Sequence, residues 1–300
     1  MGPAVVRRSA PAAASTRAPG WLWGPAVGAR VLASSGSAAY LLPVGMPPGM
    51  PPGAPAGPPA GSPTADVLAL VSPDALRLPG AVLVPGPGDL AALRLAVGAT
   101  VAVGEGRVQG SGAQLQVRRS WLPRPVPSGS WPAAPEVVTA LDGLALRPGR
   151  ADLGPLAAEA LHDPVPGVAA LVGLGPGLTP SGDDVLCGML LVLGAAGHPD
   201  RAALADAVRG SLHRTTALSA TLLRDALDGY AVPPVRDLLA AAQHGPGPGD
   251  GGAGLTVLAR AVTRIGHSSG SDLLVGVRTA LEHLLATSVH TRPDPVPRED

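Results

Sequence analysis

The stretch that decides the fold occurs twice, as Ser181-Gly-Asp-Asp-Val-Leu-Cys-Gly188 and Ser269-Gly-Ser-Asp-Leu-Leu-Val-Gly276. Both copies fit Ser-Gly-x-Asp-x-Leu-x-Gly, and each opens an apolar segment of helical character. An interior helical glycine lowers stability by about 1 kcal/mol relative to alanine, so glycines at matching positions need a reason. We predict that two helices pack closely at Gly188 and Gly276. Their N-terminal loops then lie at one end and frame a small polar ligand site.

A simpler explanation covers part of this pattern. Ser181-x-x-Asp184 and Ser269-x-x-Asp272 are both capping boxes, which start helices without binding anything. A capping box, however, requires neither a glycine after the serine nor the glycine-rich lead-in of residues 173–177. We therefore expect Ser181, Asp184, Ser269 and Asp272 to converge on one ligand.

The two loops and the hydroxyl-rich segment between them supply the candidate binding groups. Glycine lets the backbone approach a ligand closely, and a helix N-terminus offers unpaired N–H groups and positive potential. The adjacent aspartates suit a ligand with N–H donors, or a Mg²⁺ ion that bridges to an anion. The expected ligand-binding residues are Gly175, Gly177, Thr179, Ser181, Gly182, Asp184, Arg214, Thr215, Thr216, Ser219, Ser268, Ser269, Gly270 and Asp272.

Some of these residues have alternative interpretations. Thr216 or Ser219 suits the cap of the following helix, and spacing alone favours that role. The first loop resembles a nucleotide-binding P-loop only superficially, because the required Gly-Lys-Ser/Thr is missing. Arg214, Arg224 and Arg278 are the cations nearest to the motifs in sequence.

Two residues are the candidates for catalysis. Asp183 is not needed for the cap, and Ser271 replaces it in the second copy, so we expect a specific ligand contact there. On this basis Asp183→Ala should abolish ligand binding, whereas Asp184→Ala should mainly reduce stability. His267 is the histidine that adjoins a motif and is the general acid or base candidate, although a bond to a loop carbonyl explains it equally well. The other histidines show no zinc-binding spacing, so the sequence gives no reason to expect zinc.

Composition excludes several classes of function. The 300 residues include 22 basic and 22 acidic side chains, and this balance argues against nucleic-acid binding. The sequence contains no lysine, which excludes a Schiff base and a P-loop lysine. The single cysteine, Cys187, rules out an internal disulfide and fits a reducing cytoplasm. The longest apolar run, residues 185–196, is shorter than the roughly 20 residues that span a bilayer. We expect a soluble, cytoplasmic protein.

The chain divides into segments of different character, which predict an α+β fold. Residues 1–20 and 291–300 are expected to be disordered, and the Pro/Gly-rich tract 45–64 is expected to be a flexible insertion. Residues 21–131 contain short strand-like runs joined by glycine turns, which favour a small β sandwich or barrel-like domain. Residues 132–290 have helical periodicity and carry the motifs. The expected strands are 29–34, 38–44, 67–71, 81–84, 100–103 and 114–118, and the expected helices are 88–95, 135–144, 152–162, 181–196, 201–213, 219–229, 234–244, 255–265 and 272–286.

Three segments resemble the signatures of the AllH-type family. They are residues 171–184, residues 215–224 and residues 266–276, which read Gly-His-Ser-Ser-Gly-x-Asp-Leu-Leu-x-Gly. The resemblance implies a subunit of an oxamate carbamoyltransferase, which converts oxalurate and phosphate to oxamate and carbamoyl phosphate in allantoin-derived nitrogen catabolism. It also implies FdrA-like partner subunits. The alternative is a non-catalytic binding or scaffolding subunit whose glycines serve helix packing.

The composition of residues 45–64 generates a first prediction. Because this tract cannot form a core, its deletion is expected to leave the melting temperature and any activity nearly unchanged. Thermal unfolding of the deletion variant beside the full chain measures this. A large loss would identify the tract as a structural or partner-binding element.

Overall fold

A computed structural model describes residues 8–45, 66–244 and 253–290. Apart from Gly45, the predicted insertion lies outside the described residues, as does the predicted tail 291–300. The chain forms two compact units, which we call the barrel unit and the helical unit. The barrel unit comprises Met1–Pro125, Thr215–Asp225 and Tyr230–Pro233, and the helical unit comprises Val126–Arg214, Ala226–Gly229 and Pro234–Asp300.

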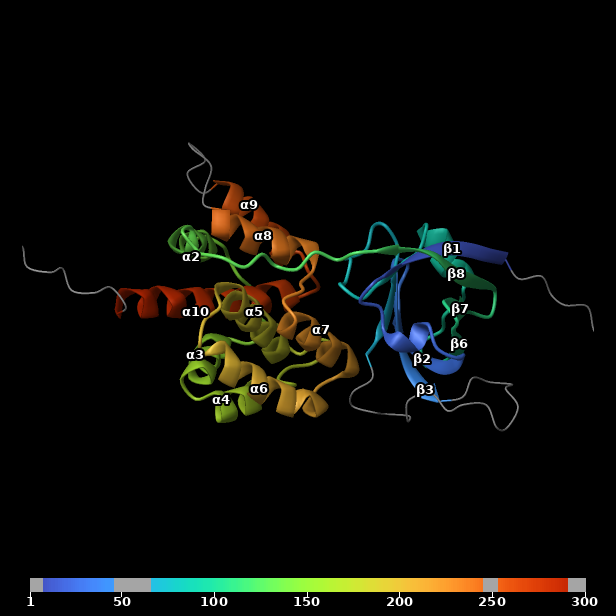
Figure 1. The fold of residues 1–300 in the computed structure, drawn as a ribbon, viewed down its shortest axis with the longest axis horizontal. Coiled ribbons are helices and arrows are strands. Elements are labelled where there is room, and N and C mark those ends of the chain that lie inside the picture. Colours follow the sequence, from blue (N-terminus) through green and yellow to red (C-terminus); the bar gives the residue numbers. More distant parts are fainter. Residues whose placement is uncertain (1–7, 46–65, 245–252, 291–300) are drawn as a thin grey trace, which may run out of the picture. The chain divides into compact units, whose positions relative to one another are not determined.

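The barrel unit contains a closed eight-stranded β-barrel (Figure 1). Its strands are β1 (Arg8–Ser15), β2 (Val27–Ser34), β3 (Ala38–Gly45), β4 (Leu68–Val71), β5 (Val82–Leu83), β6 (Thr100–Gly104), β7 (Arg107–Gln109) and β8 (Ala113–Trp121). They follow one another around the barrel as β1-β5-β4-β3-β2-β6-β7-β8. The expected sandwich is therefore wrong, because the sheet closes on itself through β1 and β8 and leaves no edge strand to be covered.

Strand β1 corrects the expectation of disorder for residues 8–15, whereas residues 1–7 lie outside the described residues. It pairs in parallel with β8 from Arg8 opposite Ala113 to Ser15 opposite Trp121, and antiparallel with β5. Alanine and proline are poor strand formers, so the local sequence gave no strand signal. The strand forms because two distant strands supply its hydrogen-bonding partners.

Strand β4 is buried on both faces. Its alternate residues Leu68 and Leu70 join the apolar cluster that fills the barrel, while Ala69 and Val71 join a second cluster with Leu218. Leu218 belongs to α7 (Ala217–Leu227). This strand therefore carries an apolar side chain at every position, as a strand covered on both sides requires.

Two part-buried ion pairs also join α7 to the barrel. The Arg17 guanidinium lies 3.1 Å from Asp225 and stacks on Tyr230, and Arg224 lies 2.7 Å from Asp66. The ion pair of Arg224 is therefore formed within the barrel unit. The remaining elements of this unit are α1 (Pro87–Ala92) and the 3₁₀ turn η1 (Gly20–Leu22).

The helical unit is built from α-helices. They are α2 (Ala134–Asp142), α3 (Leu153–His162), α4 (Pro164–Leu171), α5 (Ser181–Ala196), α6 (Arg201–Ser211), α8 (Pro233–His244), α9 (Ala253–Thr263) and α10 (Ser269–His290), with a 3₁₀ turn η2 (Leu212–Arg214). Helix α4 is not among the expected helices. Proline is tolerated at the first helical position, and here it occupies that position.

Helices α5 and α10 lie side by side, with backbone against backbone (Figure 1). A Cβ atom added to Gly188 would overlap the carbonyl oxygen of Leu273, and one added to Gly276 would overlap that of Val185. The predicted close packing at the two glycines is confirmed. Only hydrogen fits between these backbones, so both glycines are required by the contact.

The second glycine of each copy has a matching role. A Cβ at Gly182 would overlap the carbonyl oxygen of Leu171 at the end of α4, and one at Gly270 would overlap that of Val262 in α9. The repeated element is therefore a helix–loop–helix, formed once by α4 and α5 and once by α9 and α10. Its two glycines allow one contact with the preceding helix and one with the other copy.

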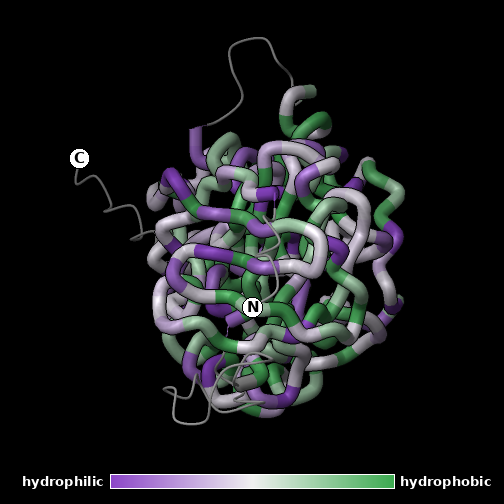
Figure 2. The backbone as a smooth tube through the Cα atoms, turned by 90° about the vertical axis from the view of Figure 1, so that its right-hand side faces the viewer, coloured by the Kyte–Doolittle hydropathy of each residue, from purple (hydrophilic) through white to green (hydrophobic). Residues whose placement is uncertain are grey.

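Helices of the described segments fall short of the length and apolar character needed to cross a bilayer. Hydrophobic and hydrophilic stretches alternate over short distances along the backbone (Figure 2). This alternation is expected of strands and helices that bury one face.

The close approach of α5 and α10 predicts the effect of substitution. Gly188→Ala and Gly276→Ala are each expected to lower the free energy of unfolding by roughly 1–3 kcal/mol, because the added methyl groups meet backbone that cannot yield. Gly210→Ala in α6 is the control, since nothing lies within 4 Å of its added Cβ. That change should be neutral or stabilise by up to about 1 kcal/mol. Urea unfolding of the three variants measures this, and equal effects at all three positions would contradict the assignment.

Candidate functional site

The candidate site lies at the N-termini of α5 and α10. Both helices begin at the serine of their octet, so Ser181 and Ser269 are helical residues and not caps. The N-cap of α5 is Pro180, and it makes no side-chain capping bond. The capping-box interpretation of the first copy is therefore wrong, and the polar side chains of the octet remain available for other contacts.

Asp183 holds the glycine-rich lead-in loop. Its side chain is inaccessible to solvent, and its Oδ1 atom accepts a 2.9 Å hydrogen bond from the backbone N–H of Gly173. Gly173 has a φ of 73°, a conformation that favours glycine. Asp183 therefore holds the turn that leads into α5, and its predicted contact with a ligand stays a prediction.

Asp184 and Asp272 are the two buried carboxylates with an unused oxygen. They are 7% and 0% exposed, and among the described residues the Oδ2 atom of each has no hydrogen-bond partner. The Ser269 hydroxyl donates to Asp184, and Ser269 Oγ lies 3.0 Å from Thr179 Oγ1 of the first loop. The two loops thus meet, as predicted, whereas their binding of one ligand stays a prediction.

A third segment, residues 147–150, completes the site. The backbone N–H of Arg147 donates to Ser271 Oγ at 3.2 Å, and that of Gly149 donates to Asp272 Oδ1 at 2.7 Å. A Cβ at Gly149 would overlap Ser181 Oγ and would lie 3.1 Å from Ser268 Oγ and 3.4 Å from Asp272 Oδ2. Residue 149 therefore packs closely against oxygens of both motifs, and only glycine fits there without displacing Ser181 Oγ.

This segment is not among the predicted site residues. Its signal was Arg147-Pro-Gly-Arg150, a turn-forming pair between two cations, which lies outside the repeated motif. Arg147 is exposed, whereas Arg150 pairs with Asp152 at 2.7 Å. Arg147 is therefore the arginine that backbone contacts bring to the site.

Burial dominates the electrostatics of the site. It raises the pKa of Asp184 well above the usual carboxyl range, the Ser269 hydrogen bond opposes that rise, and the charges of Asp272 and Asp183 add to it. Both helix N-termini direct positive dipole potential and N–H groups to the same place, which partly offsets the burial of the carboxylates. Such a site favours a ligand that donates hydrogen bonds to carboxylates.

The other predicted site residues differ in their surroundings. Gly175, with a φ of 116°, lies against the Ser181 backbone N–H, and a Cβ there would lie 2.9 Å from that nitrogen. Gly177 and His267 are exposed on the two loops. Arg214 donates to the carbonyl oxygen of Ala169 at 3.0 Å.

The remaining predicted residues, Thr215, Thr216 and Ser219, belong to the barrel unit at the start of α7. Thr216 Oγ1 accepts a 3.1 Å hydrogen bond from the Ser219 N–H, which is the capping role that spacing favoured. Arg278, the other nearby cation, pairs with Asp142 at 2.8 Å and with Glu282 at 2.9 Å. These contacts stabilise local structure.

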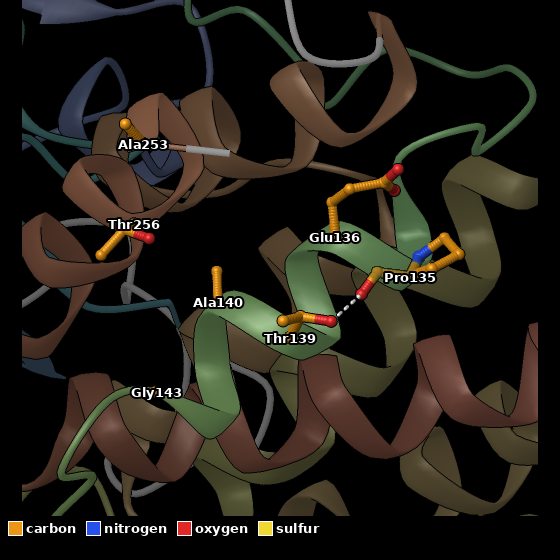
Figure 3. A pocket seen from close by; sticks show the side chains of 7 residues that line it. All are labelled: Pro135, Glu136, Thr139, Ala140, Gly143, Ala253 and Thr256. Carbon is orange, nitrogen blue, oxygen red and sulfur yellow. Dashed lines mark hydrogen bonds between the residues drawn. The ribbon is translucent and has the colours of Figure 1, made fainter. Parts of the chain in front are cut away.

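A groove of about 500 Å³ lies elsewhere on the helical unit, between α2 and α9 (Figure 3). It is lined by Pro135, Glu136, Thr139, Ala140, Gly143, Ala253 and Thr256. The Thr139 hydroxyl donates to the Pro135 carbonyl oxygen at 2.9 Å. None of the predicted site residues lines this groove, and it lacks the convergent polar atoms found at the helix N-termini.

The fold and the site define an α+β protein with a polar site formed by two parallel loop–helix repeats. Residues 171–281 match the model of the family described as oxamate carbamoyltransferase subunit AllH. This match covers both copies of the repeat and confirms the resemblance found in the sequence. No curated protein and no solved structure matches the chain.

The pKa of Asp184 generates a stability prediction. Because burial raises this pKa, the folded chain keeps the proton to higher pH than the unfolded chain does. The associated stability is fully present below the ordinary carboxyl pKa and is lost as the pH rises toward the raised value. Asp184→Asn has no such proton, so its free energy of unfolding should increase relative to wild type from about pH 4 toward neutrality.

Urea unfolding at a series of pH values tests this. The matched control is Asp206→Asn, which changes a carboxylate that is 77% exposed on α6 and should follow the wild-type profile. Parallel profiles for wild type and Asp184→Asn would contradict the prediction.

Proposed function

We propose that this chain is a subunit of an oxamate carbamoyltransferase-like enzyme that acts on oxalurate and phosphate. We further propose that the ends of α5 and α10 bind the amide-rich part of oxalurate. The family match to residues 171–281 supports the first statement. The observation that carries the second is the pair of buried carboxylates, Asp184 and Asp272, each with an unpartnered Oδ2 atom.

An unsatisfied buried carboxylate oxygen is destabilising, so its retention indicates a ligand that satisfies it. The glycines of the octet are explained by helix packing, but these oxygens are not. Oxalurate carries amide N–H groups that can donate to Asp184 and Asp272. Its carboxylate, or the phosphate, can accept from helix N-terminal N–H groups and can pair with Arg147.

The reaction places one demand on the site. A phosphate oxygen forms a bond to the carbamoyl carbon, the bond from that carbon to the oxamate nitrogen breaks, and this nitrogen takes up a proton. Asp184 suits the role of donor, because burial raises its pKa toward the working range of a general acid. His267, exposed on the loop before α10, is the second candidate.

Carboxylate and hydroxyl oxygens also suit Mg²⁺. As an alternative to amide binding, Asp184, Asp272 and Ser181 would hold the ion, which would supply positive charge to the phosphate; Asp184 would then be ionised, and His267 would be the proton donor. FdrA-like proteins are the proposed partner subunits, and the cytoplasm is the proposed location.

The second candidate function is a non-catalytic binding subunit within the same complex. It is favoured by the use of Gly182, Gly188, Gly270 and Gly276 for packing, since these contacts need no ligand. In that case the site binds oxalurate or oxamate, and a partner subunit supplies the groups that react.

Calorimetric titration of the isolated chain with oxalurate, phosphate and Mg²⁺ tests the site. Asp184→Asn and Asp272→Asn are each expected to weaken oxalurate binding by roughly 10- to 100-fold, the effect of losing a hydrogen bond to a charged group. Gly149→Ala should act in the same direction, because its methyl group would overlap Ser181 Oγ and displace that side chain from the site. Asp206→Asn is the control and should bind as wild type does. Unchanged oxalurate binding in all three site variants would overturn the site.

The reaction is tested separately. The chain is co-purified with the products of its neighbouring genes, and carbamoyl phosphate formation from oxalurate and phosphate is measured. Product formation that Asp184→Asn abolishes supports catalysis at this site. Product formation that survives the substitution, together with weakened oxalurate binding, assigns the chain the non-catalytic role.

A further inference from the structure

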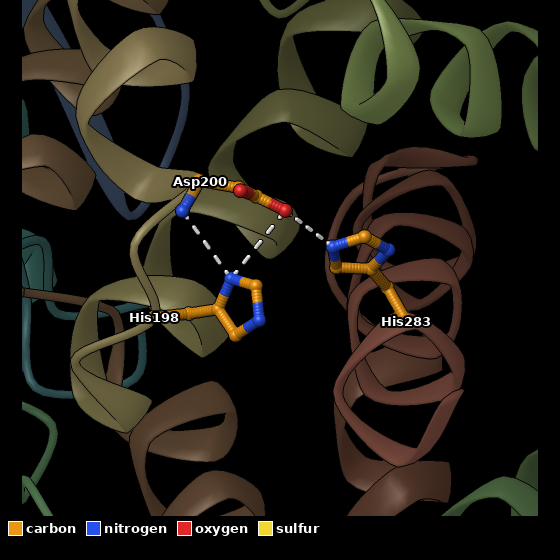
Figure 4. A group of neighbouring side chains, drawn as sticks. All are labelled: His198, Asp200 and His283. Atoms are coloured by element: carbon orange, nitrogen blue, oxygen red, sulfur yellow. Dashed lines mark hydrogen bonds and ion pairs between the residues drawn. The ribbon is translucent and has the colours of Figure 1, made fainter. Parts of the chain in front are cut away.

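Three side chains with metal-binding atoms meet at the other end of α5 and α10. They are His198 and Asp200, which follow α5, and His283 on α10. One ligand atom from each lies within 4.8 Å of the other two. Figure 4 shows the two imidazole rings on either side of the Asp200 carboxylate, which faces both. His283 Nε2 lies 2.7 Å and His198 Nδ1 lies 3.6 Å from Asp200 Oδ2.

We propose that His198, Asp200 and His283 form a binding site for a divalent transition-metal ion, with Zn²⁺ as the best-suited ion. Two imidazole nitrogens and one carboxylate oxygen are a ligand set that zinc sites use, with water in the fourth position. The side chains of His198, Asp200 and His283 are 12%, 43% and 25% exposed, so the cluster is enclosed by protein but reaches solvent at the carboxylate. A water molecule can therefore complete the coordination.

The hydrogen-bond partners of His198 fix its tautomer for this role. Thr287 Oγ1 lies 3.2 Å from His198 Nε2, and the Thr287 hydroxyl itself donates to the His283 carbonyl oxygen at 2.9 Å. Because that proton is already used, Thr287 Oγ1 accepts from His198, and the imidazole carries its proton on Nε2. The lone pair of Nδ1 then faces Asp200 and accepts only a 3.3 Å contact from the Asp200 backbone N–H. A hydrogen bond that fixes the tautomer is characteristic of metal-binding histidines.

The imidazole of His283 can move its single proton from Nε2 to Nδ1 and stay neutral. In the absence of metal its Nε2–H donates to Asp200 Oδ2, and on metal binding the proton is on Nδ1. The location also favours a cation. Helix α5 ends at Ala196, and the negative end of its dipole therefore lies two residues before His198.

This cluster is separate from the proposed substrate site. His283 lies eleven residues after Asp272 on α10, which corresponds to about 16 Å along the helix. The ion would tie the segment after α5 to α10 and so hold the parallel pair together at the end away from the ligand. The result of a zinc-binding experiment is therefore independent of whether the N-terminal site binds oxalurate.

Zinc titration of tag-free, metal-stripped full-length protein tests the proposal. Wild type is expected to bind one Zn²⁺ per chain and to gain melting temperature. His198→Gln, His283→Gln and Asp200→Asn should each weaken binding by on the order of 100-fold, and Thr287→Val by roughly tenfold, as loss of an outer-shell partner does. His162→Gln on α3 removes an exposed histidine and should bind as wild type does.

A measurement on the wild-type chain guards against variants that do not fold. Addition of Zn²⁺ should shift the ring ¹⁵N resonances of His198 at Nδ1 and of His283 at Nε2, while those of His162 stay in place. Two results would each overturn the site: wild type that takes up neither Zn²⁺, Co²⁺ nor Mn²⁺, or binding that remains unchanged in both His198→Gln and His283→Gln.

Discussion

The helical unit depends on the backbone contact between α5 and α10 at Gly188 and Gly276. Helices with side chains at the crossing point stay about 8–10 Å apart, whereas glycine lets the main chains touch. Both N-termini meet at residues 181 and 268–272, and the rings of His198 and His283 meet farther along with their centroids 5.1 Å apart. The two helices therefore run in the same direction, and this contact sets the register of every group along them.

Parallel alignment has an electrostatic consequence. Two helix N-termini at one place concentrate positive potential there, which partly stabilises carboxylates that burial would otherwise disfavour. Asp183, Asp184 and Asp272 occupy that position, each in the first turn of its helix. The same arrangement puts negative potential near the C-terminus of α5, where two histidines and an aspartate gather. A polar site at one end and a cation-binding cluster at the other are consistent with one geometric cause.

The different roles of the octet residues also follow from this contact. Gly182 and Gly270 allow each helix to begin against the preceding one, and Gly188 and Gly276 allow the two copies to meet. Asp183 holds the lead-in loop through Gly173. Asp184 and Asp272 remain, with oxygens that packing does not use. The residues that serve packing are therefore different from the two whose carboxylate oxygens packing leaves without a partner.

The sequence by itself determined the repeat, the approach of its helices and the meeting of its loops, because interior glycines at matching positions require a close contact. It also determined most strands and helices, since apolar periodicity and glycine turns are local signals. Only the tertiary structure decided that β1 closes a barrel with β8, because that pairing joins residues about 100 positions apart.

Roles that depend on surroundings were likewise decided by the tertiary structure. Asp183 and Asp184 are adjacent in sequence and equal in chemistry, yet one bonds to a backbone N–H and the other keeps an unpaired oxygen. Gly149 and the His198–Asp200–His283 cluster lie outside any repeated spacing and are brought in from separate segments. Burial and hydrogen-bond partners come from residues far along the chain, so no local pattern can contain them.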